Sequence, residues 1–222
     1  AALNLTFKEW TRLPEGVSEG SANQLWSTSA YVGVIMRGLV GITPQASGLL
    51  IKPTVPAEFA GGFSLKGFKY RGATLDIQVS GQGTVVESFT LDGKPALNFI
   101  PGDLQGAHTL AITMSTQEAV AGLSVPELGA QGQDLTLTAK SAGAQRPVLY
   151  AAVGAAGRFE AVEPSSQKDG VLTFDVKTAT GTDPLAQFAL VFAAEQDAQG
   201  QPKRMGHVYR VGLVPDWSVY FE

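Results

Sequence analysis

The chain of 222 residues contains no cysteine, only two histidines and no apolar run long enough to span a membrane. Without cysteine it can form neither a disulfide nor a cysteine-ligated zinc site. We expect no membrane partner, because a spanning helix needs roughly 20 consecutive apolar residues. The compartment stays open, since many periplasmic proteins also lack cysteine; a bacterial periplasmic or secreted location is favoured over the cytoplasm.

Positive charge is also scarce. Sixteen Lys and Arg residues stand against 20 Asp and Glu, which gives a formal net charge of −4, and no basic run exceeds two residues. Nucleic-acid surfaces usually carry a basic stripe, so we exclude a nucleic-acid partner. Hydrophobic residues make up 44% and charged residues 16%, which is typical of a globular chain with a packed core.

A single strong helix is predicted, over residues 21–39. Ser21 and Gln24 have the spacing of a capping box, and Gly38 and Gly41 provide a C-terminal stop. Its apolar residues lie on all sides: Leu25, Trp26, Ala30, Val32, Val34, Ile35, Met36 and Leu39. A helix that is apolar all round is expected to be buried all round. Either it needs partners that this chain lacks, or it packs between a sheet and a second surface.

Short strands and turns are predicted for the rest of the chain. The 26 glycines and 12 prolines punctuate stretches that alternate apolar and polar residues, and Asp92-Gly93 is a hairpin signal. The fold class is therefore mainly β, with two antiparallel β-sandwich domains preceded by one buried helix. We expect a loop and helix over 1–42, a first sandwich over 43–114 and an immunoglobulin-like sandwich over 115–222. Residues 115–132 are expected to be a connector.

The candidate catalytic groups are carboxylates in the first loop. Glu15 lies between Pro14 and Gly16, and Glu19 follows. Paired carboxylates are the groups that glycoside chemistry needs, and aromatic faces such as those of Trp10 and Trp26 are common sugar platforms. From the residues alone, solvated loop acids at a helix N-terminus are the larger possibility.

Other chemistry finds less support in the sequence. His108 and His207 lie far apart, each in a predicted strand, and are expected to be structural or surface residues. No phosphate-binding loop, G-x-S-x-G or H-E-x-x-H motif occurs. We expect no metal and no cofactor.

The segment LPEGVSEGSANQLWSTSAYVGVIMRGL resembles the final hairpin of the (α/α)6-barrel glycoside hydrolases, which include glucoamylases and debranching α-1,6-glucosidases. The positions that carry this resemblance are Pro14, Glu15, Gly20, Gln24, Trp26, Ser27 and Ala30. The next stretch is similar to the step from the last barrel helix into a β-sandwich cap. Its matching positions are Gly48, Leu49, Ile51, Pro53, Pro56, Phe63, Gly67, Tyr70, Arg71, Gly72, Leu75 and Ile77.

The resemblance implies that the helix is the last of an (α/α)6 barrel and that the chain is the C-terminal segment of a glycoside hydrolase. Glu15 would be the general base, with Glu19 as second choice, and Trp10 and Trp26 would contact substrate. The partners would be a carbohydrate and the N-terminal catalytic part of the same protein, since the missing initiator Met suggests a longer chain. This chain alone would be inactive. The alternatives are a phosphorylase parent, a non-catalytic carbohydrate- or protein-binding module, and a structural protein.

Overall fold

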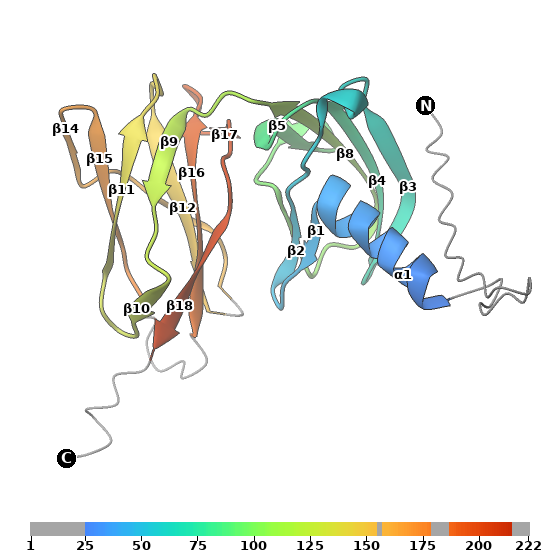
Figure 1. The fold of residues 1–222 in the computed structure, drawn as a ribbon, viewed down its shortest axis with the longest axis horizontal. Coiled ribbons are helices and arrows are strands. Elements are labelled where there is room, and N and C mark those ends of the chain that lie inside the picture. The colour runs from blue at the N-terminus through green and yellow to red at the C-terminus, as the bar shows by residue number, and fades with distance from the viewer. Residues whose placement is uncertain (1–24, 155–156, 179–186, 215–222) are drawn as a thin grey trace, which may run out of the picture.

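Short antiparallel strands joined by glycine and aspartate turns dominate the structure (Figure 1). The computed structural model describes residues 25–154, 157–178 and 187–214. These residues form one helical segment followed by two β-sandwiches, so the predicted mainly-β fold class is confirmed.

The first sandwich consists of a small and a larger sheet. The small sheet has the order β1 (Ile42–Pro44), β2 (Gly48–Ile51), β7 (Phe99–Pro101). The larger sheet has the order β3 (Phe63–Tyr70), β4 (Ala73–Gly81), β8 (Gly106–Ser115), β5 (Val85–Leu91), β6 (Lys94–Pro95). A 3₁₀ turn, Ala57–Phe59, connects the two sheets.

Period-two alternation explains how the larger sheet packs. In β4, Leu75 and Ile77 are buried while Asp76 and Gln78 between them are exposed, because neighbouring side chains point to opposite faces. The β4–β8 pair is parallel, an exception to the predicted antiparallel order. It arises because β8 lies between β4 and the oppositely directed β5, so it is antiparallel to β5 and parallel to β4.

The second sandwich has two sheets. One has the order β14 (Ser166–Lys168), β15 (Val171–Val176), β11 (Leu135–Ser141), β9 (Val120–Ser124). The other has the order β10 (Leu128–Ala130), β18 (Tyr209–Val214), β16 (Phe188–Gln196), β12 (Pro147–Val153), β13 (Glu160–Val162), and β17 (Pro202–Lys203) pairs with β16. Taken in chain order, the strands occupy the D-E-B-A and G-F-C positions of an immunoglobulin-like sandwich.

The predicted connector is part of this sandwich. Residues 115–132 contain β9, which pairs with β11, and β10, which pairs in parallel with β18 of the opposite sheet. The expectation of a connector was therefore wrong. Pro126 lies between the two strands and has no N–H to donate, so the first ladder ends there and the chain can cross to the other sheet.

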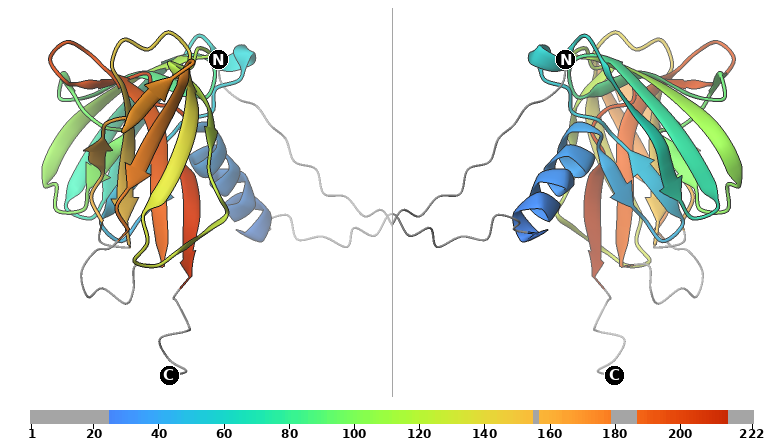
Figure 2. Two further views of the ribbon diagram at one scale, coloured as in Figure 1. Left: turned by 90° about the vertical axis from the view of Figure 1, so that its left-hand side faces the viewer. Right: turned by 90° about the vertical axis from the view of Figure 1, so that its right-hand side faces the viewer.

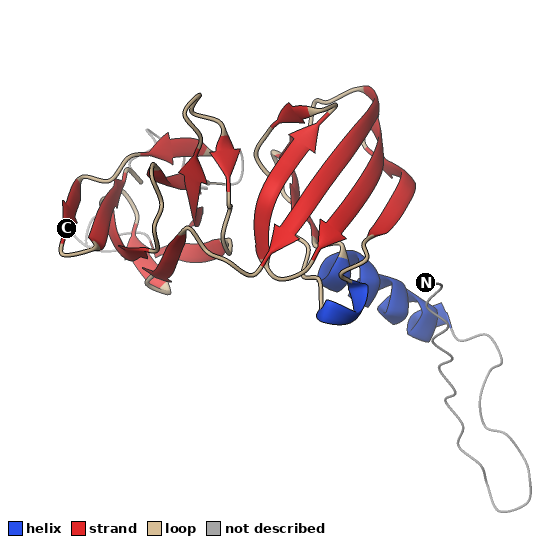
Figure 3. Ribbon diagram, turned by 90° about the horizontal axis from the view of Figure 1, so that it is seen from above, coloured by secondary structure: helices blue, strands red, loops and turns tan. Residues whose placement is uncertain are grey.

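Strand β16 is buried on both faces, as the two sandwiches lie side by side (Figure 3). Leu149, Val191 and Ala193 face the core of the second sandwich. The alternating side chains join the core of the first sandwich, and they are Val148, Tyr150, Leu190, Phe192, Ala194, Met205 and Val208. The sandwiches therefore share a continuous apolar layer. At their junction, the β1–β2 and β7–β8 loops of the first sandwich lie near the β12–β13 loop of the second.

The helical segment comprises α1 (Leu25–Gly33) and a π-helical continuation, η1 (Val34–Leu39), and ends at the predicted residue. Gly41 has φ +75°, and a Cβ there would lie 1.9 Å from the Lys52 carbonyl oxygen, so the turn into β1 requires glycine. None of the described helices is long and apolar enough to span a membrane.

The expectation that this helix is buried all round is wrong for this chain. Ile35 and Met36 pack against the first core, but Val32 and Val34 have exposed fractions of 50% and 69%. In Figure 2 the helix stands at the flank of the sandwiches and not between them. The first sandwich therefore covers one side of the helix, and part of its apolar surface is left open.

Candidate functional site

The sequence-predicted catalytic residues fall outside the description. Trp10, Glu15 and Glu19 precede residue 25, and Trp26 lies in α1 but its side chain is not among those described. The structure therefore neither brings these four side chains together nor separates them. The candidate sites that it does contain are a hollow beside the helix and a cavity at the junction of the sandwiches.

The hollow beside the helix has a volume of about 490 Å³ and lies where the helix meets the first sandwich. Its lining is mostly apolar and consists of Ser29, Val32, Gly33, Met36, Arg37, Ile42, Pro44 and Phe68. Val32, one of these lining residues, is 50% exposed. An apolar surface that follows a helix and a sheet edge suits packing against other apolar elements better than binding a polar ligand.

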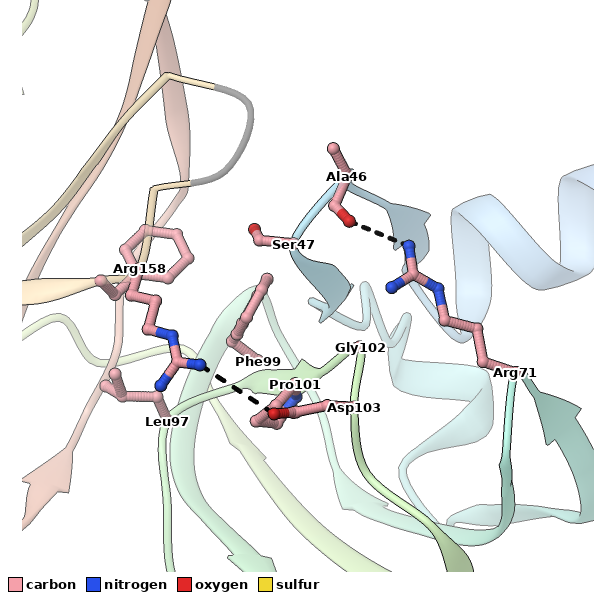
Figure 4. Close-up of a pocket in the computed structure, with 10 residues that line it drawn as sticks. Ala46, Ser47, Arg71, Leu97, Phe99, Pro101, Gly102, Asp103 and Arg158 are labelled. Atoms are coloured by element: carbon pink, nitrogen blue, oxygen red, sulfur yellow. Dashed lines mark hydrogen bonds and ion pairs between the residues drawn. The ribbon is translucent and has the colours of Figure 1, made fainter. Parts of the chain in front are cut away.

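The junction cavity has a volume of about 560 Å³ and takes side chains from both sandwiches (Figure 4). The first sandwich contributes Ala46, Ser47, Arg71, Leu97, Phe99, Pro101, Gly102 and Asp103, and the second contributes Arg158 and Phe159. The Ser47 hydroxyl donates to the Gly157 carbonyl at 3.1 Å and so links the two walls. This size and this mixture of aromatic and charged groups are typical of small-molecule sites.

Arg71 is held at one wall of the cavity by its backbone and by the neighbouring chain. It occupies a tight turn between β3 and β4 with φ 50°, and its Nη2 donates to the Ala46 carbonyl at 2.9 Å. A Cβ on Gly102 would lie 2.0 Å from Arg71 Nη1, so the guanidinium lies directly against this glycine. Gly102 N–H in turn donates to the Ser47 carbonyl at 2.9 Å.

The opposite wall carries Arg158 and Phe159. Arg158 Nη2 lies 4.0 Å from Asp103 Oδ2, and Figure 4 shows Arg158 and Arg71 approaching from opposite sides. The Phe159 ring meets the Phe99 ring edge to face at 5.5 Å and the Phe192 ring at 5.2 Å. The aromatic lining is therefore continuous with the apolar layer that joins the sandwiches.

A polar network supports the β7–β8 loop that carries Asp103. His108 Nδ1 lies 2.7 Å from Asp92 Oδ2, and His108 Nε2 lies 2.9 Å from the Gln105 carbonyl oxygen. The hydrogen bond to Asp92 raises the pKa of His108 above its ordinary value, and the same bond lowers the pKa of Asp92. His108 is in β8, as predicted, and both of its ring nitrogens lie against oxygen atoms of this network.

The second histidine, His207, does not lie in a strand, although a strand was predicted for it. His207 precedes β18 and is not part of it, and its ring meets the Tyr209 ring edge to face at 4.7 Å. Burial, followed by the nearby Lys52 charge, lowers the pKa of His207. Among the described residues no cluster of His, Asp or Glu is arranged to hold a metal ion.

Sequence reasoning identified none of the residues of the junction cavity as a site. Of these residues the sequence singles out only Arg71, as a position in the resemblance to the β-sandwich cap. The available signal was an arginine in a tight turn, where a side chain is displayed by a rigid hairpin. Nothing in the sequence showed that this hairpin faces residues 87 positions further along, because that depends on how the two sandwiches pack.

No family model and no curated protein matches this chain.

Proposed function

We propose that the chain is the C-terminal helix-and-cap segment of an (α/α)6-barrel glycoside hydrolase, which cleaves glycosidic bonds in oligo- or polysaccharides. The observation that carries this proposal is that the helix is only partly buried. Ile35 and Met36 pack on the first sandwich, while Val32 and Val34 are 50% and 69% exposed and leave part of the helix open. The occupants of the open side are neighbouring helices of the barrel.

The open surface supports this assignment because of its chemistry. Apolar side chains in the middle of a helix are stabilised by burial, at about 25 cal/mol per Å² of apolar area. The adjoining hollow extends the same apolar surface to Ile42 and Phe68 of the first sandwich. A partner that covers the helix and reaches the sheet edge would fill both the open helix surface and the hollow. A packed layer of helices fits this description better than a soluble ligand does.

In this function Glu15 is the general base and activates a water molecule for attack on the anomeric carbon. Its general-acid partner belongs to the upstream part of the barrel. In an inverting enzyme the two carboxyls are roughly 6.5–9.5 Å apart, which leaves room for that water. Glu19 is the second choice for the base, and Trp10 and Trp26 are the proposed sugar platforms. The two sandwiches serve as accessory domains, and this chain by itself has no hydrolytic activity.

The test is the substitution Glu15→Gln in the polypeptide that includes the upstream barrel. Replacing the carboxylate with an amide removes the proton acceptor but keeps the shape of the side chain. The kcat should therefore fall on the order of 10²–10⁴-fold. Release of reducing sugar from a panel of oligosaccharides measures it. The matched control is Glu118→Gln, because Glu118 is an exposed residue ahead of β9 and should leave kcat unchanged.

Near-normal turnover of the Glu15→Gln enzyme would remove Glu15 from the mechanism and make Glu19→Gln the next variant. A polypeptide with no activity on any glycoside before mutation would contradict the proposed function itself.

A further inference from the structure

We propose that the junction cavity is a second carbohydrate site, which binds an acidic saccharide with the sugar carboxylate on Arg71. The choice of a saccharide depends on the proposed function. The preference for an anion depends on the charges that line the cavity. This site is distinct from the chemistry assigned to Glu15, and it would give the accessory sandwiches a binding role.

The charge of the lining favours an anion. Its ionisable side chains are two arginines and one aspartate, Arg71, Arg158 and Asp103. The pair between Arg158 and Asp103 is 4.0 Å long, and the side chains are 82% and 77% exposed, so water screens it strongly. Arg71 has no ion-pair partner in the part of the chain that the structure describes. One full positive charge therefore remains uncompensated at the cavity.

Arg71 is prepared for a carboxylate in particular. A guanidinium has five N–H donors in a planar fork that matches the two oxygens of a carboxylate. The described hydrogen bonds use one donor, toward the Ala46 carbonyl. That bond and the contact with Gly102 hold the guanidinium at the cavity wall, and its other donors can reach a ligand.

The rest of the cavity suits a sugar ring. Phe99 and Phe159 both line it and provide apolar surface for the C–H face of a pyranose. Asp103 and Arg158, at the rim, offer an acceptor and donors for ring hydroxyls. A volume of about 560 Å³ is sufficient for one or two sugar units.

The experiment measures binding to this chain of two sugars that differ in a single group. Methyl glucuronide carries a carboxylate where methyl glucoside carries a hydroxymethyl group, and the galacturonide and galactoside give a second pair. Titration calorimetry and saturation-transfer NMR should show at least about tenfold tighter binding of each acidic sugar, a difference of 1.4 kcal/mol. Added salt should reduce this preference, because the recognition is electrostatic.

Two variants locate the preference. Arg71→Gln should abolish it, and Gly102→Ala should weaken it, because the new Cβ would displace the guanidinium without removing it. The control is Arg146→Gln, which should leave the preference intact, because within the described residues its guanidinium donates to the Asp197 and Ala198 carbonyls and does not line the cavity. Circular dichroism of each variant verifies that the fold is retained.

Equal affinity for acidic and neutral sugars would overturn the proposal, as would an acid preference that survives Arg71→Gln. Failure of all four sugars to bind would also overturn it. None of these results bears on hydrolysis, because that is measured on the longer polypeptide with Glu15→Gln. Absence of hydrolysis by the unmutated longer polypeptide, with retained binding of acidic sugars to this chain, would contradict the proposed function alone.

Discussion

At the scale of single residues, the Asp92–His108 pair is the clearest electrostatic device in the described part of the chain. Both ring nitrogens of His108 face acceptors, the Asp92 carboxylate and the Gln105 carbonyl, so the doubly protonated ring satisfies both. Asp92 also accepts from the Thr109 N–H at 2.9 Å, and Lys94 is nearby. The pair thus connects the β5–β6 hairpin to the β7–β8 loop.

The pair should make stability depend on pH. The raised pKa of His108 means that its contribution is complete below the unfolded-state pKa of 6.5 and is lost as pH rises through the folded-state pKa. The lowered pKa of Asp92 means that its contribution is present above 3.8 and is lost as pH falls through the folded-state pKa. Asp92→Asn should therefore reduce the free energy of unfolding most between about pH 4 and pH 6.5, and less toward pH 8.

Urea unfolding of the wild type and Asp92→Asn across this pH range measures the difference. Asp134→Asn is the matched control, because Asp134 pairs with Lys177 and not with a histidine. A difference that is flat with pH for Asp92→Asn would show that His108 is not charged in the folded state.

Single turn residues could be predicted from the sequence, whereas long-range partners could not. Asp92-Gly93 forms the expected turn, with φ of 50° and 76°, because few residue pairs tolerate these angles. The contact of Arg158 with Asp103 joins residues from different sandwiches, and both are ordinary surface residues in the sequence. Only the packing of the sandwiches brings them together.

At the scale of secondary-structure elements, strands were predicted well where one face is exposed. The alternation in β4 correctly indicated its exposed and buried faces. In β16, the sequence FALVFAAEQ has no alternation, which is the pattern of a strand buried on both faces. The sequence therefore indicates whether a strand is buried on one face or on both. It does not indicate which element covers the second face, because alternation carries no information about partners. The same limit applies to the helix, whose apolar pattern predicted burial that this chain provides on one side only.

Burial on both faces gives β16 an unusual sensitivity to substitution. Phe192 points away from the core of the second sandwich and is 0% exposed, because the first sandwich covers it and Tyr150 stacks on it at 5.3 Å. Phe192→Ala should lower the free energy of unfolding by about 3–5 kcal/mol. Denaturant titration measures this loss.

Val171→Ala is the control for that substitution. Val171 lies on the outward face of β15, where it is 40% exposed, and its truncation should cost at most about 0.5 kcal/mol. Comparable losses for the two variants would mean that the outer face of the β16 sheet is not covered in solution.

At the scale of the whole molecule, the segment after β17 connects the sandwiches. Met205 and Val86 exchange two backbone hydrogen bonds, of 2.8 and 2.9 Å, and the Arg204 N–H donates to the Glu87 carbonyl at 3.1 Å. Glu195 of β16 is 1% exposed, and its Oε2 lies 2.6 Å from Arg204 Nη2 as an ion pair and not as a well-directed hydrogen bond. With the shared apolar layer, these contacts indicate that the two sandwiches unfold as one cooperative unit.

Arg204 should therefore be one of the residues most important for stability. Arg204→Met leaves the buried Glu195 carboxylate with Lys203 Nζ at 3.9 Å and with the Gln145 N–H at 3.0 Å. Removing one partner of a buried ion pair costs about 3–5 kcal/mol, because the other charge stays desolvated. The double variant with Glu195→Gln removes that charge as well and should be more stable than Arg204→Met alone. Calorimetric unfolding of the wild type, both single variants and the double variant gives the coupling energy.

The matched control is Arg146→Met, because the described hydrogen bonds of its guanidinium are solvent-exposed and its loss should cost less than about 1 kcal/mol. If the sandwiches are one unit, the wild type unfolds in a single transition, and Arg204→Met lowers the temperature of that transition without dividing it, because the apolar layer around Phe192 remains. Two separate transitions in the wild type would contradict the cooperative junction. They would also weaken the case for a preformed cavity, because the arginines on its opposite walls, Arg71 and Arg158, would then belong to independently moving domains.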